Sequence, residues 1–142
     1  MSSTLLGNNQ PIFSRLGDVQ WSNAVSAGNS GTNITAGTSY LVFTADATAG
    51  GYVQRIRFRP LGTNIATVAR VWVNNGGTTG TTGNNVLFDE ISLAASTAST
   101  SAALANSELP LNFALPASYR LYVTLGTGIA AGYDVTVIGG KY

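Results

Sequence analysis

The sequence predicts an all-β protein: a single-domain antiparallel β-sandwich, specifically an eight-stranded jelly roll, with an N-terminal arm. Two observations predict this fold. The 142 residues break into short β-branched and aromatic runs separated by clusters of Gly, Asn, Ser, Thr and Pro. Several runs alternate apolar and polar residues, and no segment has the periodicity of an amphipathic helix. Because one sheet with a bare apolar face cannot offset its ordering cost, two sheets are expected to close on each other.

Residues 1–17 are the predicted arm, and residues 18–142 are the predicted sandwich domain. The arm consists mostly of turn-forming residues around two apolar pairs, Leu5–Leu6 and Ile12–Phe13, without strand or helix periodicity. Two interpretations stay open. The segment is either a flexible terminus or an arm that lies on a neighbouring subunit, with Ile12 and Phe13 as its contacts.

The domain contains eight runs that we predict to be strands, at 18–25, 40–46, 51–60, 66–74, 86–94, 109–115, 119–125 and 133–139. In the run 51–60, one face is expected to carry Tyr52, Ile56 and Phe58. Its other face would carry Val53, Arg55, Arg57 and Arg59. In the run 66–74, parity places three small apolar residues opposite Arg70 and Trp72, namely Ala69, Val71 and Val73. The last three runs each group their apolar residues on one face: Leu109, Leu111, Phe113 and Leu115; Tyr119, Leu121, Val123 and Leu125; and Tyr133, Val135 and Val137.

Two connections have low sequence complexity. The segment 74–85 (NNGGTTGTTGNN) has no apolar residue, so it predicts a mobile, exposed hairpin loop that does not pack. The segment 94–106 (AASTASTSAALAN) favours an irregular connection, although an alanine-rich stretch can also form a short helix.

The composition argues against most catalytic chemistry. The chain has no His and no Cys, which removes imidazole and thiolate nucleophile pairs and metal ligands. We therefore predict no catalytic residue, no cofactor and no metal. The net charge of +1 argues against nucleic acid or an anionic membrane as a partner. The N-terminus lacks the basic start and apolar core of a secretory signal, so we expect synthesis in the cytoplasm without export.

Three arginines, Arg55, Arg57 and Arg59, form a ladder on one strand face, and Arg70 is available to extend it. Because like charges repel, a partner of opposite charge is expected. One interpretation is cross-strand pairing with carboxylates such as Asp89 or Glu90. The other is contact with an acidic protein.

Tryptophan residues offer a second candidate contact. Trp72 is expected on the same side of its strand as Arg70, away from the apolar face. Such a side chain could pack at a subunit interface or stack on a sugar, and Trp21 and Tyr122 are further candidates.

From residue 50 to residue 142, the sequence contains a characteristic order of motifs: GGYVQRIRFRPLGTNIATVARVWVNNG, LFDEISLAA, LPLNFALPASYRLYVTL and YDVTVIGGKY. The first contains a V-x-R-I-R strand and an R-V-W strand, and the last ends in V-x-V-x-G-G. This order resembles small β-sandwich virion proteins of tailed bacteriophages, the capsid decoration or cement proteins.

The resemblance implies a non-enzymatic structural protein on the capsid surface of a virion. Such a protein would bind the major capsid protein where capsomers meet, as a homotrimer, and stabilise the shell through many weak contacts. The alternative is a tail, fibre or receptor-binding module that recognises host glycan through the 74–85 loop and Trp72.

Overall fold

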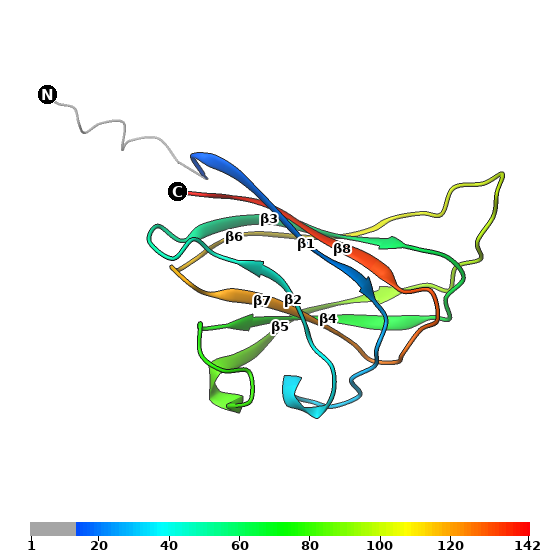
Figure 1. The fold of residues 1–142 in the computed structure, drawn as a ribbon, viewed down its shortest axis with the longest axis horizontal. Helices are drawn as coiled ribbons and strands as arrows, with labels where there is room; N and C mark the ends of the chain where they lie inside the picture. The colour runs from blue at the N-terminus through cyan, green and yellow to red at the C-terminus, as the bar shows by residue number, and fades with distance from the viewer. Residues whose placement is uncertain (1–13) are drawn as a thin grey trace, which may run out of the picture.

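The computed structural model describes residues 14–142, and these residues form two four-stranded antiparallel sheets with no α-helix among them (Figure 1). The strand order is β1-β8-β3-β6 in one sheet and β2-β7-β4-β5 in the other. The strands are β1 (Leu16–Val25), β2 (Tyr40–Thr44), β3 (Gly51–Pro60), β4 (Thr67–Asn74), β5 (Asn85–Leu93), β6 (Ser107–Leu115), β7 (Arg120–Leu125) and β8 (Tyr133–Lys141). Two short 3₁₀ turns, η2 (Ile34–Ala36) and η3 (Thr82–Asn84), lie in the connections.

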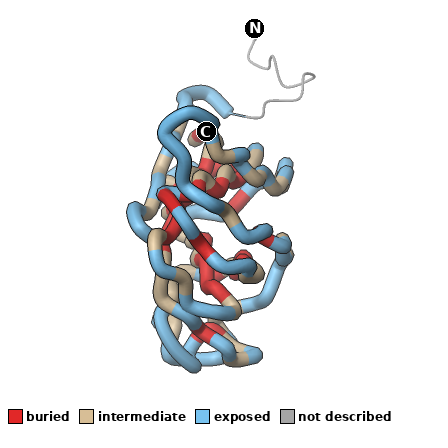
Figure 2. Tube along the Cα trace, turned by 90° about the vertical axis from the view of Figure 1, so that its right-hand side faces the viewer, coloured by how far each residue is buried: buried red, intermediate tan, exposed pale blue. Residues whose placement is uncertain are grey.

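The two sheets pack face to face around one hydrophobic core, which the buried segments of Figure 2 trace between the layers. Each predicted strand overlaps an observed one, with ends that differ by a few residues. The predicted inward sets of β7 and β8 are confirmed, because Leu121, Val123 and Leu125 are fully buried and Val135 and Val137 are as well. At about 1.5–3 kcal/mol for each large side chain, this burial is the main favourable contribution to folding.

For the first half of β3, the prediction of which side chains share a face is wrong. The register of β3 shifts between Val53 and Arg55 against both neighbouring strands: opposite β8 the extra residue is Gln54 of β3, a β-bulge, and opposite β6 the extra residue belongs to β6. An irregular residue of this kind moves the side-chain alternation by one position. Val53 is therefore fully buried together with Ile56 and Phe58, and Tyr52 lies on the outer face with the arginines.

The chain enters the fold earlier than expected. β1 begins at Leu16, inside the segment predicted as an arm, and the Arg15 amide donates to the Lys141 carbonyl at 2.9 Å. Ile12 and Phe13, the predicted contacts of the arm, lie outside the described residues. Gln20 of β1 joins the two sheets, since its side-chain amide exchanges two hydrogen bonds of 2.9 Å with the backbone of Thr44 in β2.

Asn64, which is 3% exposed, ties three connections together at one end of the molecule. Its Oδ1 accepts hydrogen bonds from the amides of Ala131 and Gly132, each at 2.9 Å, and its backbone exchanges two hydrogen bonds with Ser96. Ser96 belongs to the 94–106 connection, which is irregular as expected and contains no helix. No helix in residues 14–142 has the length and apolar character to span a membrane.

The 74–85 loop is a β4–β5 hairpin loop, as predicted, and none of residues 75–84 is buried, but side-chain hydrogen bonds hold the loop at its base. Asn74 is fully buried, and its Nδ2 donates to Asn85 Oδ1 at 2.7 Å. Its Oδ1 accepts from the Gly76 amide at 2.8 Å, and Asn85 Nδ2 donates to the Thr79 carbonyl at 3.0 Å. Asparagine side chains therefore form hydrogen bonds with backbone groups of a loop that has no apolar residue to pack.

Candidate functional site

The outer face of the β1-β8-β3-β6 sheet combines exposed apolar side chains with an ion-pair cluster. The antiparallel register aligns two rows of residues across the four strands. One row runs Trp21, Thr136, Arg57 and Glu108, and the next runs Val19, Ile138, Arg55 and Pro110. We call this surface the Arg/Trp face and define it by seven of these residues: Val19, Trp21, Arg55, Arg57, Glu108, Thr136 and Ile138.

Trp21 and Val19 are the apolar part of the Arg/Trp face. Their side chains are 66% and 51% exposed, on the solvent side of the edge strand β1. Ile138 of the neighbouring strand β8 lies directly across from Val19 and extends the apolar strip. Interface centres are enriched in aromatic side chains and arginine, and truncating such a residue often costs much of the binding energy.

Glu108 of β6 lies between two arginines of β3. Its Oε2 accepts a hydrogen bond of 2.8 Å from Arg57 Nε, and its Oε1 is 3.0 Å from Arg55 Nε. The second contact is an ion pair by distance only, because Arg55 Nε has no hydrogen-bond partner of suitable geometry among the described residues. Two guanidinium groups thus share one carboxylate, and the cluster keeps one net positive charge. More than a third of Glu108 is exposed, so these pairs add little to stability.

Arg59, the third member of the predicted ladder, has a different role. Its Nη1 donates to the Leu104 carbonyl and, at 3.2 Å, to Asn106 Oδ1. Both acceptors belong to the segment before β6. Arg59 therefore fastens a connection at one end of the sheet instead of extending the Arg55–Glu108–Arg57 cluster.

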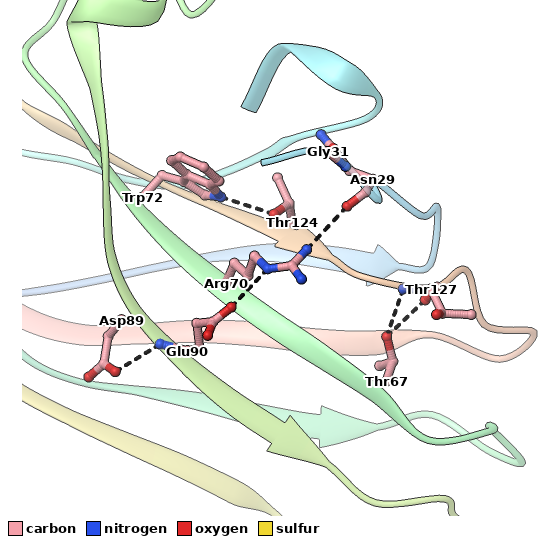
Figure 3. Close-up of polar contacts among 9 residues, drawn as sticks. All are labelled: Asn29, Gly31, Thr67, Arg70, Trp72, Asp89, Glu90, Thr124 and Thr127. Atoms are coloured by element: carbon pink, nitrogen blue, oxygen red, sulfur yellow. Dashed lines mark hydrogen bonds and ion pairs between the residues drawn. The ribbon is translucent and has the colours of Figure 1, made fainter. Parts of the chain in front are cut away.

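The prediction that Arg70 extends this cluster is wrong, and so is the expected pairing of the ladder with Asp89 or Glu90. Arg70 lies on β4, whose outer side faces away from the Arg/Trp face, because Ala69 and Val71 beside it point into the shared core. Its Nε donates to Glu90 Oε2 at 2.8 Å (Figure 3). Glu90 thus neutralises Arg70. The carboxylate that pairs with Arg55 and Arg57 is Glu108.

Trp72 shares the outer side of β4 with Arg70, as predicted, but it is only 4% exposed. Its Nε1 donates to Thr124 Oγ1 of β7 at 2.9 Å, a buried hydrogen bond drawn in Figure 3. The chain segment that connects β1 to β2 lies close by and contributes to its cover. Trp72 is therefore not an open stacking platform.

The sequence reasoning named Trp21 but preferred Trp72, and it missed Val19, Ile138 and Glu108. The difficulty lies in β1, where the apolar residues Val19 and Trp21 face solvent and the polar Gln20 faces inward. Alternation alone does not tell which set is buried at a sheet edge. The signal that could have helped is Glu108 at the start of the run that pairs with β3.

Two titratable groups outside the Arg/Trp face have shifted pKa values. Hydrogen bonds from the amides of Ala49 and Thr48 to Oδ1 hold the pKa of Asp46 below its usual value, with a smaller contribution from Lys141. Burial raises the pKa of Tyr133. Within residues 14–142, no three His, Cys, Asp or Glu side chains gather as a potential metal site.

The Arg/Trp face is thus an exposed sheet surface with an apolar strip, a shared carboxylate and one surplus positive charge. Such a surface suits contact with a protein that presents apolar side chains beside a carboxylate. Comparisons of the chain with protein-family models, with curated proteins and with solved structures found no match.

Proposed function

We propose that this chain is a non-enzymatic structural protein of a bacteriophage virion, a capsid decoration or cement protein. It binds the outer surface of the shell at capsomer junctions and stabilises the shell. The observation that carries the proposal is the Arg/Trp face, where Trp21, two-thirds exposed, lies in the same cross-strand row as Arg57, with only β8 between their two strands. This face is the surface that docks on the major capsid protein.

The strand order supports an assignment of the fold as a jelly roll. An eight-stranded jelly roll consists of two sheets built from interleaved Greek keys, in which the first strand pairs with the last. Here β1 pairs with β8, β2 pairs with β7, and β3 lies between β8 and β6. This order also agrees with the resemblance to small virion proteins.

Binding follows from the chemistry of the face. A carboxylate of the capsid protein approaches the Arg55–Glu108–Arg57 cluster and compensates its surplus charge, while Trp21 and Val19 are buried against apolar residues. One such patch gives moderate affinity. Three copies around a junction convert it into high avidity without any new type of contact.

The test is co-sedimentation of the purified chain with expanded shells that lack it. Wild-type protein is expected to bind saturably, and Arg57→Glu is expected to weaken binding by about tenfold or more, because it places a like charge beside Glu108 and the incoming carboxylate. The matched control is Arg120→Glu, which makes the same change on the outer side of β7 in the other sheet. Absence of wild-type binding, or equal loss in both variants, would contradict the proposal.

The trimer is tested separately by native mass spectrometry of the full chain. The proposal expects a species of three copies, either free in solution or after release from shells. A chain that stays monomeric in both preparations would remove the trimer from the proposal and leave the docking face to be judged by co-sedimentation.

A further inference from the structure

A hollow of about 230 Å³ lies on the outer side of the β2-β7-β4-β5 sheet, opposite to the Arg/Trp face. Loop residues 30–32 form one wall, and the rest comes from Arg70 and Trp72 of β4 and from Leu87 and Glu90 of β5. Figure 3 shows Arg70 between Glu90 on one side and the Asn29 backbone on the other, with Trp72 on the same strand.

The loop wall is built from internal hydrogen bonds. Asn29 is 2% exposed, its amide donates to the Leu125 carbonyl at 2.6 Å, and its Nδ2 donates to the Ile34 carbonyl at 3.1 Å. Its Oδ1 accepts from the Gly31 amide at 3.1 Å. A Cβ at Gly31 would lie 2.0 Å from the Cβ of Ala36, so only glycine permits this close approach. The hollow is therefore formed before any ligand arrives.

The charged groups of the hollow, Arg70 and Glu90, compensate each other, and each keeps one polar atom without a hydrogen bond to the described residues. Arg70 Nε is bonded to Glu90 Oε2 at 2.8 Å, and Nη1 makes a long contact of 3.5 Å with the Asn29 carbonyl. Arg70 Nη2 and Glu90 Oε1 form no hydrogen bond with any residue of the described part of the chain. One charged donor and one charged acceptor thus stand side by side, each with bonding capacity to spare.

The remaining surface is apolar and hydroxylic. Leu87 is 42% exposed and supplies the apolar surface, and the largely buried Trp72 also lines the hollow. Ser30 and Thr32 supply hydroxyl groups on the opposite wall. A ligand that satisfies this hollow needs one apolar face and several neutral groups that both donate and accept hydrogen bonds.

We propose that the hollow binds one uncharged sugar ring. The C–H face of a pyranose packs on the exposed Leu87, while its hydroxyls donate to Glu90 Oε1 and accept from Arg70 Nη2. An anion is disfavoured because Glu90 already compensates Arg70, and an apolar ligand would leave the free donor and acceptor unsatisfied. The volume is below that of drug-sized pockets and accommodates a single ring.

This inference does not depend on the proposed function. The hollow and the Arg/Trp face lie on opposite sides of the sandwich and share no residue. A variant that loses shell binding through the Arg/Trp face should still bind the sugar, and a variant that loses sugar binding should still bind shells.

The test is a titration of the full ¹⁵N-labelled chain, followed by amide chemical shifts. The ligands are the methyl glycosides of glucose, galactose, mannose, N-acetylglucosamine and rhamnose, together with the corresponding free sugars and glucuronic acid. At least one neutral ligand is expected to bind saturably with a Kd in the millimolar range, with shifts confined to residues 30–32 and the neighbouring parts of β4 and β5. Binding of the methyl glycoside identifies the terminal residue of a glycan as the source, whereas binding of the free sugar alone identifies a free monosaccharide.

Two matched variants decide whether the ligand uses the proposed acceptor. Glu90→Gln is expected to raise Kd by about tenfold or more, because it weakens a hydrogen bond to a charged group. Glu108→Gln makes the same change in the ion pair of the opposite face and is expected to leave Kd unchanged. The proposal is overturned if no neutral sugar binds saturably, if glucuronic acid alone binds, or if the two variants weaken binding equally.

Discussion

Replacing Trp21 by alanine tests how much of the docking energy comes from the apolar strip of the Arg/Trp face. Trp21 is the most exposed of the large apolar side chains in residues 14–142, and it lies on an edge strand. Its substitution therefore removes surface that a partner would cover while leaving the core untouched.

The magnitude follows from the exposed area. A tryptophan side chain offers about 150–250 Å² for burial, and 66% of that is free here, which gives about 100–165 Å². At about 25 cal/mol per Å², full burial against the shell contributes about 2.5–4 kcal/mol. Since about 1.4 kcal/mol corresponds to a tenfold change in affinity, Trp21→Ala is expected to raise Kd for shells by about a hundredfold.

The assay is a binding isotherm on expanded shells, with urea unfolding of the free protein measured in parallel. The control is Leu41→Ala on β2, which removes an apolar side chain that is 45% exposed on an edge strand of the other sheet. Leu41→Ala is expected to bind like the wild type. A change in Kd of less than about threefold for Trp21→Ala, with the folded state intact, would refute the assignment of this face.

Three further predictions concern the fold. Asn64→Ala removes three side-chain hydrogen bonds from a buried position and is expected to lower the free energy of unfolding by about 3 kcal/mol, measured by urea denaturation; a loss below about 1 kcal/mol would contradict the role of Asn64. Trp72→Phe removes the donor to Thr124 and is expected to cost about 1–2 kcal/mol in the same measurement, whereas an unchanged stability would show that the bond contributes nothing. Because the pKa of Asp46 is lowered in the folded state, its stabilising effect is present above the usual carboxyl pKa of about 3.9 and is lost as the pH falls below it. Stability should therefore drop less steeply in acid for Asp46→Asn than for the wild type, and parallel pH profiles would argue against this shift.

The strands could be predicted from the sequence because period-two alternation is a local property. Leu121, Val123 and Leu125 are inward at every second position of β7, and no irregularity disturbs them. The alternation failed at Gln54, where a bulge reverses the faces of Tyr52 and Val53. A bulge depends on how neighbouring strands fit together, and nothing in the run 51–60 marks it.

The candidate site was less accessible to prediction, because it depends on which strands are neighbours. The outward direction of Arg55 and Arg57 followed from parity, but their partner Glu108 comes from β6, about fifty positions further along the chain. Arg70 points outward as well, but from the other sheet. The strand order determines to which sheet a strand belongs, and the local alternation gives no information on it. The cover over Trp72 comes from an irregular loop for which alternation gives no information.

The most direct test of the docking face is a reconstruction of the particle that carries this chain, at a resolution that shows side chains. We expect the β1-β8-β3-β6 sheet to face the shell, with Trp21 buried against the capsid protein and a capsid carboxylate beside Arg55 and Arg57. A particle in which the β2-β7-β4-β5 sheet faces the shell, or in which Trp21 stays in solvent, would contradict the account.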